Sequence, residues 1–399
     1  MNQEATAVED MTAVRAGRRR TAVRIGVPAA IATVVAIGMG LVPALASDES
    51  PNLPAISAQD LIAKAVSANT DTFSGTVRVN ADLGLPTALT DLASGSGPLG
   101  EMARGAGAKT GSADPQMKAV ELLGGSHTLS VSSDGPDRQR LTLSGQKSGY
   151  ELVHNGDQVW AYDRSSQQAL HLTGTGTDGH RPDGKEGIGS ITPQDVAKQL
   201  LEHSSDTTSV TVDGTERVAG HAAYKLSIKP KQAGSTVAEI RVSIDADKGM
   251  PLAVQLRTVD GATAFDVRFG TLSYDKPDAK TFQFSVPKGA KVIEQSAKDH
   301  TANPMPSIPG LPSLPTGGGT DGAKDGAKGG VIGEGWTAIA HGDAGADAAK
   351  GIAKFAGREV KGGTLVSTRI VNALITKDGK VYMGAVTPET LEQAAASGK

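Results

Sequence analysis

The chain of 399 residues contains no cysteine, and only 3% of its residues are aromatic. The missing cysteine excludes disulfides, thiolate zinc sites, iron–sulfur clusters, a cysteine nucleophile and a lipid-modified cysteine. The formal net charge is only −3, from 40 basic and 43 acidic residues, so a basic face for nucleic acid is not expected. Glycine is abundant, with 50 residues, which indicates many turns and segments that are not packed.

The N-terminal segment joins a basic cluster to a long uncharged stretch. Arginines gather at positions 15–24, residues 25–46 carry no charge, and an Ala-Leu-Ala site at 44–46 precedes two acidic residues. This order is typical of a secretory signal peptide, which would make residues 1–46 a removable segment. The stretch at 25–46 is also long enough to span a bilayer, so a retained transmembrane anchor stays open. Either alternative makes the chain extracytoplasmic, secreted or anchored to the cytoplasmic membrane by residues 25–46, with its C-terminus outside.

Apolar and polar residues alternate over most of residues 73–286. Tyr224, Leu226 and Ile228 alternate with polar neighbours, and the same period recurs at residues 240–244 and 265–269. Strict alternation predicts strands with one apolar and one wet face. Asp-Gly and Asn-Gly turns separate the runs, as expected for hairpins. We therefore expect a curved antiparallel sheet of about ten or more strands.

A one-sided sheet needs a cover for its apolar face. The sequence predicts helices at residues 57–69, with a capping box of Ser57 and Asp60, and at residues 192–203. Few helices over a long sheet leave either a filled core or a cavity, and both remain open. The Gly- and Ala-rich insertion at residues 85–124 is either a loose lid or a disordered loop.

The chain is expected to contain two folded parts. Residues 47–299 form the sheet domain, and a Pro- and Gly-rich linker covers residues 300–330. Residues 331–399 form a small C-terminal α/β module, which should dock on the sheet domain or on a partner because its own core is marginal. We expect in it a strand at 336–339, a helix at 344–356, a hairpin of 365–375 with 381–386, and a final helix.

Motifs for catalysis, cofactors and metals are weak or incomplete. Two G-x-G-x-x-G matches, at 95–100 and 174–179, do not lie between a strand and a helix. An S-x-x-K match at 144–147 follows the K-T-G match at 109–111, which is the wrong order for a penicillin-recognising serine enzyme. No histidine has a second histidine two or four residues on. We therefore expect a non-enzymatic protein with no catalytic residue, cofactor or metal.

Several segments together carry a family resemblance. In their order and spacing they are similar to the LolA/RseB (MucB) superfamily of periplasmic lipoprotein carriers and envelope-stress sensors. The likeness is strongest to its actinobacterial branch of exported LolA-like proteins, and it covers roughly residues 57–295. It implies an α+β fold, a half-open antiparallel β-barrel with covering helices, to which this chain adds its C-terminal module. The segments are residues 124–129 with 134–136, 159–162, 218–226, 244–252 and 282–290.

The resemblance also implies a function. The protein would bind an apolar ligand, a lipid or the acyl chains of a lipoprotein, in the half-barrel as a carrier or sensor. The alternative is an RseB-like regulator that binds an anti-sigma factor or another membrane protein. An uncleaved anchor would favour a tethered binder or sensor over a shuttle. The candidate ligand-binding residues are Trp160, Tyr162, Tyr224, Leu226, Phe265 and Phe269.

Overall fold

The computed structural model describes residues 50–85, 124–144, 149–173, 205–296, 330–343 and 357–397, and residues 113, 115, 118, 122, 198, 201 and 202. The expected signal or anchor, the linker, and most of the 85–124 insertion and of the helices at 192–203 and 344–356 lie outside these residues. Within the described part of the chain, no helix is long and apolar enough to cross a membrane.

One 12-stranded sheet dominates the molecule, in the order β12-β6-β5-β4-β3-β2-β1-β11-β10-β9-β8-β7. Neighbouring strands are antiparallel except β12 and β6, which are parallel. Because β12 and β7 stand at opposite ends of this order, the sheet is open and no barrel closes. The strands are β1 (Thr72–Asp82), β2 (Gly124–Asp134), β3 (Arg138–Leu143), β4 (Tyr150–Asn155), β5 (Gln158–Asp163), β6 (Gln168–Thr173), β7 (Thr208–Val218), β8 (His221–Pro230), β9 (Val237–Asp245), β10 (Pro251–Thr258), β11 (Thr263–Ser273) and β12 (Lys291–Ser296).

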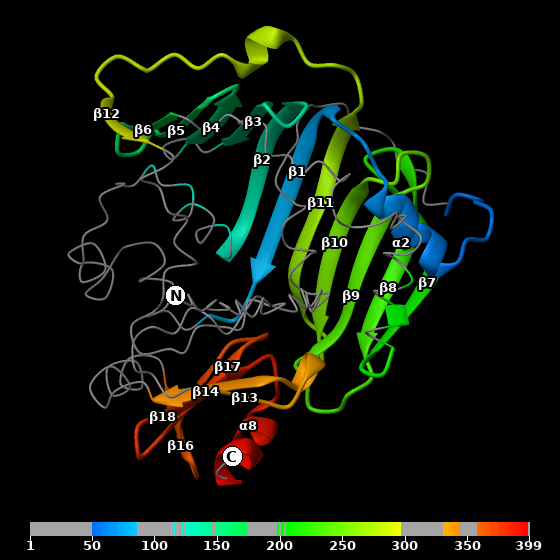
Figure 1. Ribbon diagram of the computed structural model, residues 1–399, viewed down its shortest axis with the longest axis vertical. Coiled ribbons are helices and arrows are strands. Elements are labelled where there is room, and N and C mark those ends of the chain that lie inside the picture. Colours follow the sequence, from blue (N-terminus) through cyan, green and yellow to red (C-terminus); the bar gives the residue numbers. More distant parts are fainter. Residues whose placement is uncertain are drawn as a thin grey trace, which may run out of the picture.

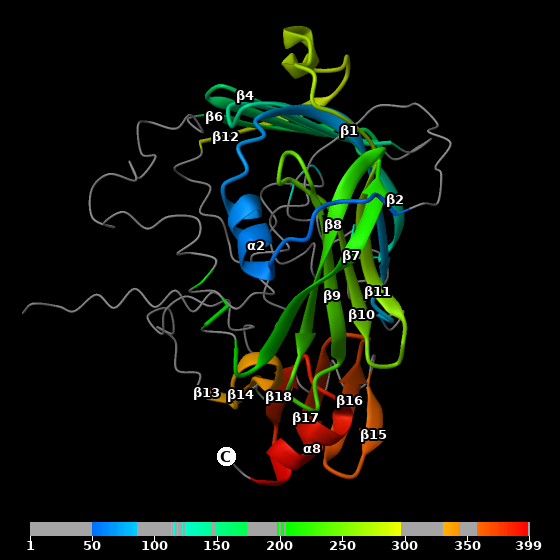
Figure 2. The same ribbon diagram turned by 90° about the vertical axis from the view of Figure 1, so that its right-hand side faces the viewer.

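The sheet is strongly curved. Figure 1 shows β3 to β6 and β12 turned across the end of β1, β2 and β7 to β11. Figure 2 shows helix α2 on the inner side of the curve and the C-terminal module below the opposite ends of β7 to β11. The expected large antiparallel sheet, mostly β with few helices, is confirmed.

Helix α2 (Ala58–Val66) begins where the sequence predicts. The Ser57 hydroxyl oxygen accepts a hydrogen bond from the backbone N–H of Asp60 over 3.1 Å, which satisfies a helix N-terminal donor. The helix ends at Val66, earlier than expected, and Ser67 caps it: its hydroxyl donates to the Lys64 carbonyl over 3.1 Å. Leu61 is buried in the cluster that contains Tyr224 and Leu226, and Ala58, Ile62 and Ala65 pack against the same cluster, so this stripe is the side of the helix that packs on the sheet.

A long connection joins β11 to β12 outside the sheet. It contains the 3-10 turn η1 (Ala279–Phe282), in which Phe282 is fully buried. Arg140 of β3 donates a hydrogen bond to the carbonyl oxygen of Thr281 over 2.8 Å. The connection is therefore held against the strands that it crosses.

The C-terminal module is a second, six-stranded sheet in the order β13-β14-β18-β17-β16-β15. Helix α8 (Pro388–Ala396) packs on one face of it through Leu391, together with Leu374 and Tyr382. Two expectations for this module were wrong. Trp336 lies in a 3-10 turn, and residues 365–375 form two strands because Thr368 and Val371 close a turn between them. The elements are β13 (Gly330–Ile332), η2 (Gly335–Thr337), β14 (Ile339–Asp343), β15 (Arg358–Val360), β16 (Gly363–Ser367), β17 (Asn372–Thr376) and β18 (Lys380–Gly384).

Candidate functional site

The inner surface of the curved sheet is apolar because the strand registers bring apolar rows together. Tyr224 of β8 lies opposite Ile244 of β9, and Leu226 lies opposite Val242. Side chains two residues apart share a face, so the register extends this surface across the sheet. We call it the concave face, and its members include Tyr224, Leu226, Ile228, Ile240, Val242, Ile244, Val254, Leu256, Phe265, Val267, Phe269, Val77, Val79, Leu129, Leu143, Tyr150, Leu152, Ala161, Leu170 and Leu172.

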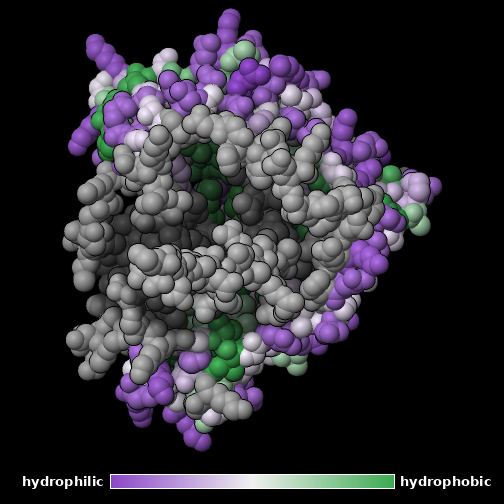
Figure 3. All heavy atoms as spheres, viewed as in Figure 1, coloured by the Kyte–Doolittle hydropathy of each residue, from purple (hydrophilic) through white to green (hydrophobic). Residues whose placement is uncertain are grey.

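Four of the six predicted ligand residues lie on the concave face. Tyr224 is 7% exposed and Leu226 5%, and both belong to the apolar cluster beneath α2. Phe269 is 8% exposed and belongs to a second apolar cluster, next to the first, on which Phe265 also packs. The Phe269 ring meets Phe73 edge-on, with centroids 6.3 Å apart. Figure 3 shows hydrophobic side chains toward the middle of this side of the molecule and mainly hydrophilic side chains at its outer edge.

The other two predicted residues, Trp160 and Tyr162, lie on the outer face of the sheet. Their neighbour Ala161 pairs with Leu152 in the concave row, so Trp160 and Tyr162 point the opposite way. The Trp160 ring stacks on His171 at 3.7 Å, and Phe284 from the β11–β12 connection lies 5.3 Å from Trp160. These two residues pack beneath that connection and are not brought together with the other four.

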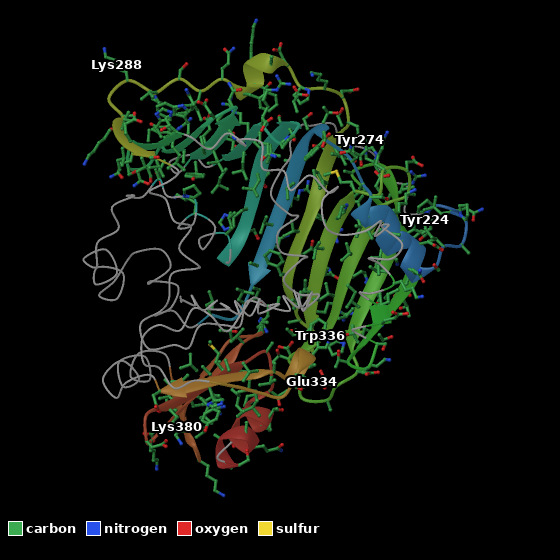
Figure 4. All side chains as sticks on the ribbon, in the orientation of Figure 1. Tyr224, Tyr274, Lys288, Glu334, Trp336 and Lys380 are labelled. Carbon is green, nitrogen blue, oxygen red and sulfur yellow. The ribbon has the colours of Figure 1, made fainter. Side chains whose placement is uncertain are left out.

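Helix α2 covers the β7 to β10 part of the concave face. Leu61 is fully buried in the cluster that contains Tyr224 and Leu226. The segment before the helix is fixed by two hydrogen bonds, one from the Tyr224 hydroxyl to the Pro54 carbonyl at 2.9 Å and one from Thr215 to the Pro51 carbonyl at 2.7 Å. Tyr224 therefore belongs both to the apolar face and to the fastening of its cover (Figure 4).

The C-terminal module closes one end of the concave face. Trp336 is 7% exposed within the cluster under α2, and its indole N–H donates to the Thr208 hydroxyl at 2.8 Å. Its backbone N–H donates to the Gln232 side chain at 2.9 Å. Figure 4 shows Trp336 between the module and the lower ends of the strands. The module docks on the sheet domain, as one of the two sequence alternatives proposed.

A salt-bridge pair ties the module to the sheet at a second place. Arg369, in the turn between β16 and β17, lies 2.9 Å from the Asp82 carboxylate and 3.1 Å from that of Asp260. Its backbone N–H also donates to the Leu83 carbonyl at 2.7 Å. The hydrogen bond from Arg369 lowers the pKa of Asp82. The pKa of Asp260 is lowered chiefly by the Thr258 hydroxyl and also by Arg369.

On the polar face of the sheet, a buried glutamate is neutralised by neighbouring basic side chains. Glu239 is only 4% exposed and accepts hydrogen bonds from Ser227 at 2.5 Å and from Arg241 at 3.0 Å. Lys229 lies 3.6 Å away. Burial opposes ionisation of Glu239, but Ser227, Arg241 and Lys229 outweigh it and hold the pKa of this carboxyl below its usual value. These neighbours explain how a carboxylate can be buried on the wet side.

Another buried carboxylate organises the turn beside α2. Asp245 is 2% exposed and accepts from the Tyr274 hydroxyl at 2.6 Å and from the backbone N–H groups of Asp247 and Lys248. Burial, together with the hydrogen bond to Asp245, raises the pKa of Tyr274. Gly249 in this turn approaches α2 so closely that an added Cβ would lie 2.6 Å from the Lys64 carbonyl oxygen. The sequence predicted this turn but not its packing on the helix.

Two gaps of different size border the concave face, and the larger, an open one of about 300 Å³, lies beside Phe73, Ser133 and Gln139. A cavity of about 20 Å³ lies between Val77, Val254, Val267 and Phe269, which is room for about one water molecule. Among the described residues, no group of three His, Cys, Asp or Glu side chains could hold a metal ion.

Comparison with known proteins finds likeness in structure alone. No protein-family model and no curated protein matches the chain. It is similar to a chain of the Pseudomonas aeruginosa MucA/MucB complex, at 16% identity over 85% of this chain and 96% of that chain, with a TM-score of 0.37. It is also similar to a LolA superfamily protein of Nitrosomonas europaea, at 12% identity over 58% of this chain and 99% of that chain, with a TM-score of 0.20. These structures belong to the superfamily that the sequence motifs resemble.

Proposed function

We propose that this protein binds an apolar ligand, a lipid or the acyl chains of a lipoprotein, on its concave face, as a non-enzymatic carrier or sensor. The observation that carries the proposal is the extent of the apolar surface, which continues in register from β7 to β6. In the described part of the chain its covers are one nine-residue helix with the segment that leads into it, the Trp336 end of the C-terminal module and isolated residues of the insertion.

Hydrophobic transfer is sufficient to hold such a ligand. Each methylene withdrawn from water contributes about 0.8 kcal/mol, so a long acyl chain gains several kcal/mol without any catalytic or charged group. Tyr224, Leu226, Phe265 and Phe269 would form the ligand-facing surface. Trp160 and Tyr162 are not part of this proposal because they lie on the other face.

Helix α2, which covers Tyr224, is held weakly enough to be displaced. A nine-residue helix has little stability of its own in water. The bonds from Tyr224 and Thr215 to the preceding segment each contribute about 1 kcal/mol, and burying Leu61 adds roughly 2 kcal/mol. These three contributions sum to a few kcal/mol, and the partly buried Ile56 and Ile62 add to them. The burial of a long acyl chain can offset a cost of this size.

The proposal places the binding domain outside the cytoplasm. Residues 47–299 would form it, residues 300–330 the linker and residues 331–399 the docked module, with residues 25–46 either removed or kept as an anchor. An anchored protein would receive its ligand at the membrane surface, as suits a sensor. A cleaved protein could diffuse with its ligand, as suits a carrier.

The test is binding of a fluorescent fatty acid, dansylundecanoic acid, to the purified full chain. Phe265→Ser removes one concave ring that is only partly buried, and it should weaken binding about tenfold. Gln255→Ser, on the polar face of the adjacent strand, is the matched control and should bind as wild type does. Thermal melts establish that both variants fold.

Equal binding by all three proteins, or none by the folded wild type, would contradict the proposal. A regulator of an anti-sigma factor or another membrane protein makes a different prediction. It would be captured by cross-linking to that protein while failing to bind the fatty acid.

A further inference from the structure

A buried carboxylate lies on the concave face. Asp163 is the last residue of β5, and it pairs with Tyr150 on one side and Gln168 on the other. Only 2% of it is exposed. The next concave row along these strands contains Leu152 and Ala161, so an apolar surface begins directly beside the carboxylate.

The two oxygens of Asp163 have different partners. Oδ1 accepts from the Ser165 backbone at 2.7 Å, the Ser165 hydroxyl at 2.5 Å and the Ser166 backbone at 3.2 Å, which fixes the β5–β6 turn. Oδ2 lies 2.9 Å from the ammonium of Lys118. Burial opposes ionisation of Asp163, but the bonds from Ser165 and Lys118 outweigh it and keep its pKa below the usual value.

Tyr150 also faces this ammonium. The Lys118 nitrogen lies 5.9 Å from the centroid of the Tyr150 ring, within the range of a cation–π interaction. The Tyr150 hydroxyl donates to the Ala113 carbonyl at 3.2 Å. A carboxylate and an aromatic ring on two adjacent, paired strands are thus both directed at one cation.

The cation itself comes from outside the sheet. Lys118 belongs to the 85–124 insertion, and its side chain is 16% exposed, so the ion pair has an opening to water. A lysine ammonium stands on a flexible four-carbon stem, whereas Asp163 and Tyr150 belong to strands. Lys118 can therefore be exchanged for another ammonium while the rest of the site stays in place.

We propose that Asp163 and Tyr150 form a binding site for the ammonium head of an amphipathic ligand, which Lys118 occupies in the ligand-free chain. The inference rests on the proposed function, because the acyl chain of this ligand would lie on the adjacent concave face. Leaving a buried carboxylate without a cation is costly. A neutral or anionic amphiphile cannot replace Lys118 without that penalty, so the site selects a primary ammonium next to an alkyl chain.

The test is titration calorimetry on the full chain with two probes of equal chain length, decylammonium and decanol. Lys118→Met keeps the length of the stem but removes the competing charge. It should raise the affinity for decylammonium at least tenfold and change that for decanol less than threefold. Asp163→Asn should abolish the preference for decylammonium. Tyr150→Leu retains the carboxylate and should lower the preference for decylammonium by a smaller factor. This variant tests the site if Asp163→Asn does not fold.

Lys225→Met, on the polar face, is the matched control and should change neither affinity. Decylammonium should also raise the melting temperature of Lys118→Met more than that of wild type. If folded Lys118→Met binds decylammonium as wild type does while decanol binds both, the ion pair is only structural and the inference is overturned. If wild type and all variants bind neither probe, the concave-face function fails, and this site fails with it.

Discussion

The hydroxyl of Tyr224 donates a hydrogen bond to the backbone oxygen of Pro54 over 2.9 Å, from the apolar face of β8 to the segment that leads into α2. One side chain therefore contributes its ring to the surface under the helix and its polar end to the bond that fastens the helix. Opening the cover breaks this bond and exposes the ring in the same step.

Tyr224→Phe should loosen α2 without unfolding the sheet. Losing a neutral hydrogen bond costs about 1 kcal/mol, which raises the population of the opened helix about fivefold. Hydrogen–deuterium exchange of residues 58–66 should be faster by roughly this factor. Tyr162→Phe is the matched control, because Tyr162 is equally buried, 7% exposed, but lies on the other face. Equal exchange of α2 in the two variants would mean that Tyr224 does not fasten the cover.

Gly249→Ala should destabilise the chain more than Gly261→Ala does. Both glycines have positive φ, +74° and +86°, so both substitutions carry a backbone penalty of about 1 kcal/mol. Only at Gly249 would the added Cβ collide with α2, at the Lys64 carbonyl oxygen, since nothing lies within 4 Å at Gly261. Overpacking adds roughly 1–3 kcal/mol. Urea unfolding measures the difference, and equal losses would show that the helix simply moves aside.

Acid should weaken the docking of the C-terminal module through Arg369. The folded-state pKa values of Asp82 and Asp260 lie below the reference value of 3.8. Stability from these pairs is therefore present above that value and lost as the pH falls through the folded-state pKa values. In a Trp160→Phe background Trp336 is the only tryptophan, so its fluorescence reports docking.

The variant Arg369→Gln lacks the pairs at every pH. Its Trp336 signal should be altered already at neutral pH and should change less between pH 5 and 2.5 than that of the parent. Lys380→Gln breaks a pair with Asp378 inside the module and should follow the parent curve. Identical curves for Arg369→Gln and the parent would show that docking does not depend on this residue.

Local patterns were sufficient to predict the sheet, its hairpins and the start of α2. Alternation in β8 and β9 fixes which residues share a face, and Ser57 with Asp60 marks a helix start through contacts within one turn. These features depend on neighbours in the sequence. The same reasoning placed Tyr224 and Leu226 on one surface, where the structure has them.

The sequence could not show on which face of the sheet Trp160 and Tyr162 lie. In β5 both alternating rows contain apolar residues, Val159 and Ala161 in one and Trp160 and Tyr162 in the other. The outer row is apolar because Phe284, distant in sequence, packs on it. The pairing of Lys118 with Asp163 was missed for a similar reason, because no local pattern relates an insertion to a strand end.

The most direct test of the central claim is residue-level mapping of a diazirine-bearing palmitate photo-cross-linked to the full chain. The concave face predicts adducts at alternate residues of β8 and β11, including Leu226, Phe265 and Phe269, and their suppression by excess palmitate. The intervening Lys225, Asp266 and Arg268 should remain unlabelled. Palmitate-suppressible labelling of those three residues, with the concave residues unlabelled, would contradict the account.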